Sequence, residues 1–201
     1  MIDQIASDRA LRRHGIPLCL HVPIAARDEA AITTYVGKIR ATLSGRGRRA
    51  FLVNAYPPAA RDAAYPIFEH PSAAVLHRPE QVWVDIGYSG YRRAYAKAFP
   101  NEPIGEAVLS HAMNRRMAAL KGFTFVRITL TSREANSSSA FAEGKGVALH
   151  GEPHQAAANR ARGNFVEYGD LTDLMLMLDI MLGGGFMDAV NEGQKLIRLK
   201  G

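Results

Sequence analysis

The sequence predicts an α/β or α+β protein, with a mixed or parallel sheet of about four strands flanked by helices and a helical C-terminal part. Short apolar runs alternate with helical patterns through the first two thirds of the chain, which is the rhythm of βαβ units. Its 201 residues are 47% hydrophobic, enough to bury one substantial core. We therefore expect a single globular domain over residues 1–201, with a helical segment from about residue 155.

Four apolar runs are the candidate strands, at residues 17–22, 50–55, 81–86 and 123–130. If the strands are parallel, their carboxyl ends meet at the edge where open α/β sheets bind ligands. That edge would carry Asn54, Asp85, Tyr88, Ser89 and Arg133.

Helical patterns fill the gaps between these runs. The first begins near Asp28 and Glu29, acidic as a helix amino end favours, and closes at Gly45. A second covers about 103–121, where Arg116 falls inside a stripe of apolar residues, Leu109, Ala112, Met113, Met117 and Leu120. Because a core-facing guanidinium needs an acceptor, we expect a buried partner or ligand there, and Asp85 is a candidate.

The last third of the chain begins with a polar loop at 132–146, and Asp170 then offers an N-cap to a helix over 171–182. That helix is apolar on nearly every face, so it is buried either in the core or against a second copy of the chain. A homo-oligomer contact through this helix would use Met175, Met177 and Met181.

The formal charge of +6 indicates either an anionic partner, such as a nucleic acid, or a well-solvated surface. The single cysteine, Cys19, rules out an internal disulfide and fits a reducing compartment. Neither a secretory signal nor an apolar run of membrane-spanning length is visible. We therefore expect a cytoplasmic protein with no membrane partner. Classical NTPase, dinucleotide and hydrolase motifs are also absent.

Three groups of residues are candidates for binding a divalent metal such as Mg²⁺, Mn²⁺ or Zn²⁺. Asp85 ends a candidate strand before a glycine-flanked loop, a common place for a carboxylate ligand of a hard cation. Glu143 and Lys145 match the Glu-x-Lys half of a metal-dependent nuclease site. In an extended segment, one face would carry His150, Glu152 and His154.

Each group also has a purely structural interpretation. Asp85 could cap its loop or pair with Arg116, and residues 143–145 could form an exposed turn. The histidines at 150 and 154 could be solvated loop residues. His111 and Asn114, one helical turn apart, could activate and orient a water molecule or simply form an exposed polar face.

Residues 88–97 interleave aromatic and basic side chains. Tyr88 and Tyr91 could stack on bases while Arg92 and Arg93 meet phosphates, although the tyrosine spacing also suits a packed helix face. Further phosphate contacts are expected from Arg115, Arg127, Arg160 and Arg162.

These patterns favour a nucleic-acid-directed protein, with a metal-dependent nuclease as the catalytic form of that hypothesis. Its catalytic residues would be Asp85, His111, Arg116, Glu143 and Lys145. The alternative is a non-catalytic homo-oligomeric assembly module, in which Asp85 and Arg116 form a structural ion pair.

Overall fold

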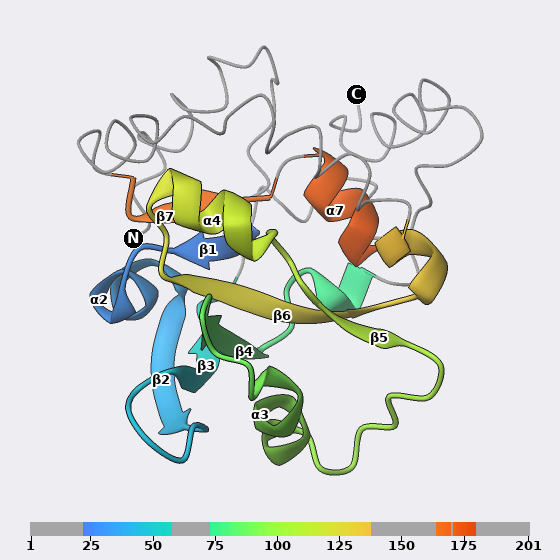
Figure 1. Ribbon diagram of the computed structural model, residues 1–201, viewed down its shortest axis with the longest axis horizontal. Coiled ribbons are helices and arrows are strands. Elements are labelled where there is room, and N and C mark those ends of the chain that lie inside the picture. The colour runs from blue at the N-terminus through green and yellow to red at the C-terminus, as the bar shows by residue number, and fades with distance from the viewer. Residues whose placement is uncertain (1–21, 58–72, 138–163, 170, 180–201) are drawn as a thin grey trace.

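The computed structural model describes residues 22–57, 73–137, 164–169 and 171–179, and these residues build a curled antiparallel sheet (Figure 1). Along the sheet the strand order is β2-β3-β4-β6-β1-β7, and β5 pairs with β6 outside this path. The strands are β1 (Pro23–Ala26), β2 (Gly37–Thr42), β3 (Ala50–Ala55), β4 (Glu80–Asp85), β5 (Val108–His111), β6 (Phe125–Thr131) and β7 (Val166–Tyr168).

The predicted α/β or α+β architecture, a mixed or parallel sheet of about four strands flanked by helices, is therefore wrong. All strand pairs of the described sheet are antiparallel, and its helices are few and short. In such a sheet the ends of neighbouring strands alternate between opposite edges. Asn54 at the end of β3 pairs with Glu80 at the start of β4, so Asn54 and Asp85 do not share an edge.

The turn between β2 and β3 shows why these strands run antiparallel. Ser44 Oγ donates to the Gly47 carbonyl over 2.6 Å and accepts from the Arg49 amide over 3.1 Å, while Gly47 adopts a left-handed conformation with φ of +66°. A short turn of this kind joins antiparallel neighbours, whereas parallel strands need a long crossover. The Ser-Gly-Arg-Gly segment closes a hairpin, not a helix.

The helix predicted from Asp28 begins there but ends early. The Asp28 carboxylate caps it by accepting from the Ala31 amide over 2.8 Å. The helix α2 (Glu29–Ala31) continues into the π-helical turn η1 (Ile32–Val36), and β2 starts at Gly37. β-branched residues in η1 lower its helix propensity. At Gly37 the chain approaches β3 so closely that a β-carbon would lie 2.1 Å from the Asn54 carbonyl oxygen.

The helix predicted over 103–121 is in fact strand β5 followed by the short helix α4 (Arg115–Lys121). Asn114 caps α4 by accepting from the Arg116 amide over 2.8 Å. Because Leu109 belongs to a strand, the apolar stripe that placed Arg116 in the core does not exist. Arg116 is exposed and does not pair with Asp85.

Strand β6 lies at the centre of the sheet and has strand neighbours on both edges. β4 pairs with it along one edge, from Asp85 opposite Phe125 to Val82 opposite Ile128. The other edge is shared, because β1 pairs with the first residues of β6 and β5 with Ile128 to Thr131. Six of the seven residues of β6 are buried.

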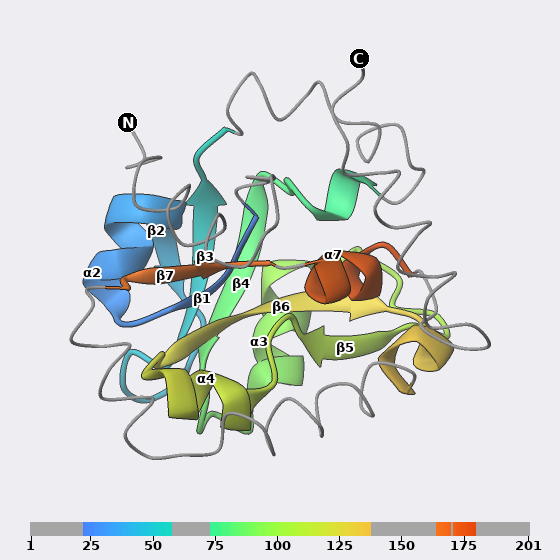
Figure 2. The ribbon, with the colours of Figure 1, turned by 90° about the horizontal axis from the view of Figure 1, so that it is seen from above.

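Two apolar clusters cover the two faces of the sheet. The larger one includes Leu52, Val82 and Val84, and three helices pack residues into it: α3 (Tyr91–Ala98), α4 and α7 (Leu171–Met177). The smaller one contains Phe51 and Trp83 together with residues of α2 and η1. Figure 2 shows α7 alongside β6, which it contacts.

The apolar character of α7 reflects burial within this chain. Residues 174–178 are buried, and Leu174, Met177 and Leu178 belong to the larger cluster. Met175 and Met177 are 1% exposed, so neither is available for contact with a second copy, while Met181 lies outside the described residues. Assembly into a homo-oligomer stays a prediction. Within the described residues, no helix has the length and apolar character needed to cross a membrane.

We expect Gly37→Ala to destabilise the protein by about 3 kcal/mol or more, because the added methyl group collides with the backbone of β3. Gly45→Ala is the matched control, since Gly45 is exposed and an added β-carbon there meets no atom within 4 Å. The measurement is urea unfolding of both variants. Equal stability of the two would contradict the close approach at Gly37.

Candidate functional site

Asp85 lies at the end of β4, where it binds Arg49 instead of Arg116. Its Oδ1 accepts from Arg49 Nη2 over 2.7 Å and from the Gly87 amide over 2.9 Å. The Arg49 guanidinium also lies 5.7 Å from the centre of the Tyr88 ring. These contacts hold the turn that leads from β4 into α3, which agrees with the loop-capping interpretation of Asp85.

Helix α3 and strand β5 meet through a pair of rings. The Tyr91 and His111 rings lie 4.7 Å apart between centroids. Burial, and secondly the charge of Arg115, lower the pKa of His111 to about 4, so the imidazole is neutral at pH 7. Its Nε2 is buried and has no hydrogen-bond partner among the described residues.

Five exposed cations lie on the two short helices that flank this ring pair. Arg92, Arg93 and Lys97 lie on the outer side of α3, whose inner side buries Ala94 and Tyr95. Arg115 and Arg116 lie on the outer side of α4. The ring pair lies between one cation of each helix. The Arg92 guanidinium lies 5.6 Å from the Tyr91 ring centre, and the charge of Arg115 lowers the pKa of His111. We call Arg92, Arg93, Lys97, Arg115 and Arg116 the α3–α4 basic surface.

Five arginines elsewhere in the described residues have carboxylate partners, whereas the exposed cations Lys38, Arg46 and Arg133 have none there. Arg49 pairs with Asp85, and four further pairs join Arg27 to Asp28, Arg40 to Glu80, Arg48 to Glu29 and Arg78 to Glu102. Within the described ranges, no residue of the α3–α4 basic surface forms an ion pair.

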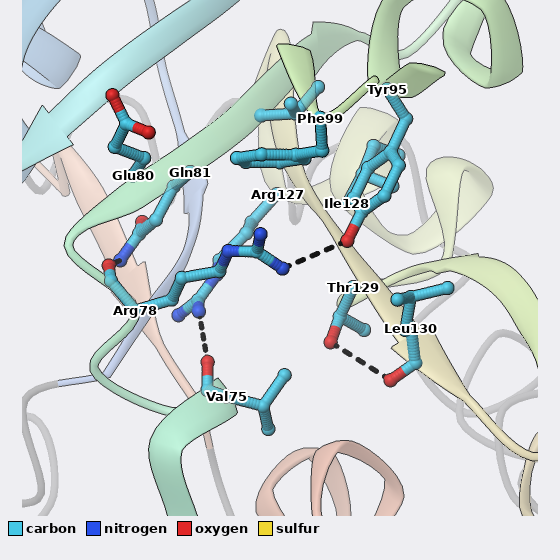
Figure 3. A pocket seen from close by; sticks show the side chains of 11 residues that line it. Val75, Arg78, Glu80, Gln81, Tyr95, Phe99, Arg127, Ile128, Thr129 and Leu130 are labelled. Carbon is cyan, nitrogen blue, oxygen red and sulfur yellow. Dashed lines mark hydrogen bonds between the residues drawn. The ribbon is translucent and has the colours of Figure 1, made fainter. Parts of the chain in front are cut away.

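A second group of polar residues surrounds a small cavity between β4, β6 and α3 (Figure 3). Arg78 binds Glu102 through two hydrogen bonds of 2.8 and 2.6 Å and donates to the Tyr95 hydroxyl over 3.0 Å. Its guanidinium also lies 3.8 Å from the centre of the Phe99 ring. Hydrogen bonding to Arg78 keeps the pKa of Glu102 below its usual value, and burial raises the pKa of Tyr95 to about 12.

Arg127, on β6, is the arginine that the fold buries. It is 1% exposed and donates to the carbonyl oxygens of Leu76, over 2.8 Å, and of Val75. Burial, and secondly the charge of Arg78, lower the pKa of Arg127 to about 9. This burial leaves Arg127 unable to reach a nucleic acid at the surface, contrary to the role expected for it.

Of the other predicted site residues, some lie in the described part of the chain and some lie outside it. Tyr88 and Tyr91 are half-buried and pack against the larger cluster, while Tyr95 is 2% exposed, as the packed-face interpretation expected. Seven residues lie outside the described ranges: Glu143, Lys145, His150, Glu152, His154, Arg160 and Arg162. Among the described residues, no three His, Cys, Asp or Glu side chains gather as metal ligands would.

Comparison with known proteins gives no relative from which a site could be transferred. No family model, curated protein or solved structure matches the chain. The candidate site therefore depends on its own geometry.

Sequence patterns did not identify Arg49, Arg78 or Glu102 as partners in these groups. Arg49 and Asp85 are 36 residues apart, and Arg78 and Glu102 are 24 apart, so no local spacing connects them. The sequence does contain one indication of a buried polar group, because Arg127 is a charged residue in the middle of an apolar strand.

We expect His111→Phe to weaken the pH dependence of stability between pH 6.5 and 4. Since the folded protein lowers the pKa of His111, the unfolded chain binds more protons in this interval and stability falls as the pH drops. The wild type should lose about 2 kcal/mol from this residue between pH 7 and 4.5. Urea unfolding at both pH values measures the loss, and an unchanged loss in the variant would contradict the burial of the imidazole.

Proposed function

We propose that the protein is a cytoplasmic nucleic-acid-binding protein that holds a single strand on the α3–α4 basic surface. The observation that carries this proposal is that α3 and α4, which flank the Tyr91–His111 ring pair, carry five exposed cations with no ion pair among the described residues. Exposed cations without carboxylate partners are the groups that bind phosphates, because binding releases condensed counterions from the nucleic acid.

The aromatic rings at the base of this surface favour a single strand over a duplex. Tyr88 and Tyr91 keep part of their side chains exposed beside Arg92, and Arg49 lies over the Tyr88 ring. Rings next to guanidinium groups are suited to stacking on unpaired bases, whereas the bases of a duplex are already stacked. The net charge of +6 supports the same class of partner.

Binding is tested with a variant that replaces four arginines of the surface by glutamine, at positions 92, 93, 115 and 116. We expect the slope of log affinity against log salt, measured with labelled single-stranded DNA and RNA of 20 nucleotides, to fall in magnitude by about 3 because four phosphate contacts are lost. Fluorescence anisotropy across a salt series gives the affinity at each salt concentration and hence the slope.

The matched control replaces four cations outside α3 and α4 by glutamine: Lys38, Arg46, Arg48 and Arg133, all exposed. It changes the net charge equally, so a general charge effect would weaken both variants alike. Equal losses in the two variants, or wild-type binding that does not respond to salt, would reject the proposal.

Nuclease activity is a separate proposal that requires Asp85 to act as a metal ligand. It predicts cleavage of the same oligonucleotides in Mg²⁺ or Mn²⁺ that Asp85→Asn abolishes while a far-ultraviolet spectrum and melting curve stay native. If Asp85 only caps the turn and pairs with Arg49, Asp85→Asn lowers stability by about 1 kcal/mol and leaves binding unchanged.

A further inference from the structure

The charges around the cavity beneath α3 do not balance. Arg78 is neutralised by Glu102, but no carboxylate of the described residues pairs with Arg127. The other carboxylate that lines the cavity, Glu80, binds Arg40, and Figure 3 shows it pointing away from the two guanidinium groups. Within the part of the chain that the structure describes, the buried charge of Arg127 thus has no counter-charge, and such a charge is costly to bury alone.

The hydrogen bonds of Arg127 are also incomplete. Two of its N–H groups reach the carbonyls of Val75 and Leu76, and the others have no acceptor among the described residues. Gln81 does not bond to them: its amide donates to the Arg78 carbonyl over 3.1 Å and its oxygen accepts from the Trp83 indole over 3.1 Å. Tyr95 is engaged with Arg78 and Glu102.

The cavity that these donors line has a volume of about 10 Å³. A cavity of this size suits one water molecule or one small ion. Water would satisfy hydrogen bonds but would leave the charge uncompensated. We propose that the cavity binds a single halide ion, chloride under ordinary conditions, held by Arg127 and Arg78.

This site is independent of nucleic-acid binding, since Arg127 is buried and the α3–α4 basic surface is exposed. The ion would neutralise the charge of Arg127 on β6. In the sheet, Arg127 pairs with Trp83, and the next residue, Ile128, pairs with Val82. Bound halide would thereby stabilise the folded state by mass action, because the unfolded chain has no such cavity.

The test compares melting of the full chain in sodium chloride, sodium bromide and sodium gluconate at equal ionic strength. We expect chloride and bromide to raise the melting temperature by about 4 °C over gluconate at 0.3 M, with saturation. Arg127→Met should remove the difference, while Arg116→Gln, which removes an exposed charge elsewhere, should retain it.

Two further measurements keep the test decisive if Arg127→Met fails to fold. Glu102→Gln retains both guanidinium groups and removes their carboxylate, so the gain from chloride should increase. A crystal grown in bromide should show an anomalous scattering peak in the cavity. Equal melting in the three salts, or a water molecule with no bromide peak, would overturn the proposal.

Discussion

The pairing of β6 along both of its edges is the constraint on which the rest of the structure depends. Since β1 and β5 divide one edge between them, the position of each is fixed by where the other ends. The end of β5 at His111 in turn determines where α4 can start and which ring faces Tyr91. A shift of one residue in this register would exchange the two faces of β6 and bring Val126 and Ile128 to the side of Arg127.

The same pairing explains why a cation is tolerated inside the sheet. Arg127 lies opposite Trp83, between the buried residues Val126 and Ile128. Its long side chain reaches the carbonyl oxygens of Val75 and Leu76, at the end of the short helix η4 (Ala73–Val75). The guanidinium thus joins a connecting segment to the central strand. Replacing it would remove both this connection and a charge, which is why the halide experiment includes a variant that leaves Arg127 in place.

Three of the four predicted apolar runs match strands, whereas the run at 17–22 lies outside the described residues except for Val22, and β1 begins after it at Pro23. The run at 50–55 coincides with β3, and those at 81–86 and 123–130 lie within two residues of β4 and β6 at each end. Strand direction could not be predicted, because the side-chain periodicity is the same in parallel and antiparallel strands. β5 was missed because its four residues also fit a helical stripe that continues into α4.

For the site, the sequence indicated the correct kind of anomaly at the wrong residue. A buried arginine does exist, but it is Arg127 in a strand and not Arg116 in a helix. The tyrosines and arginines of 88–93 were singled out correctly as neighbours, since one helix carries most of them. Their proximity to His111 and Arg115 depends on strand pairing between distant segments, which local spacing does not encode.

Strand β2 has one strand neighbour in the described sheet and so presents an open edge. Such an edge offers hydrogen-bonding groups to any other extended chain and can start aggregation. Lys38 and Arg40 place charges along it, and the register shift between Ile39 and Ala41 breaks its regular spacing. These features protect the chain against edge-to-edge growth, so a variant that neutralised both cations would risk forming fibrils even though it kept its core intact.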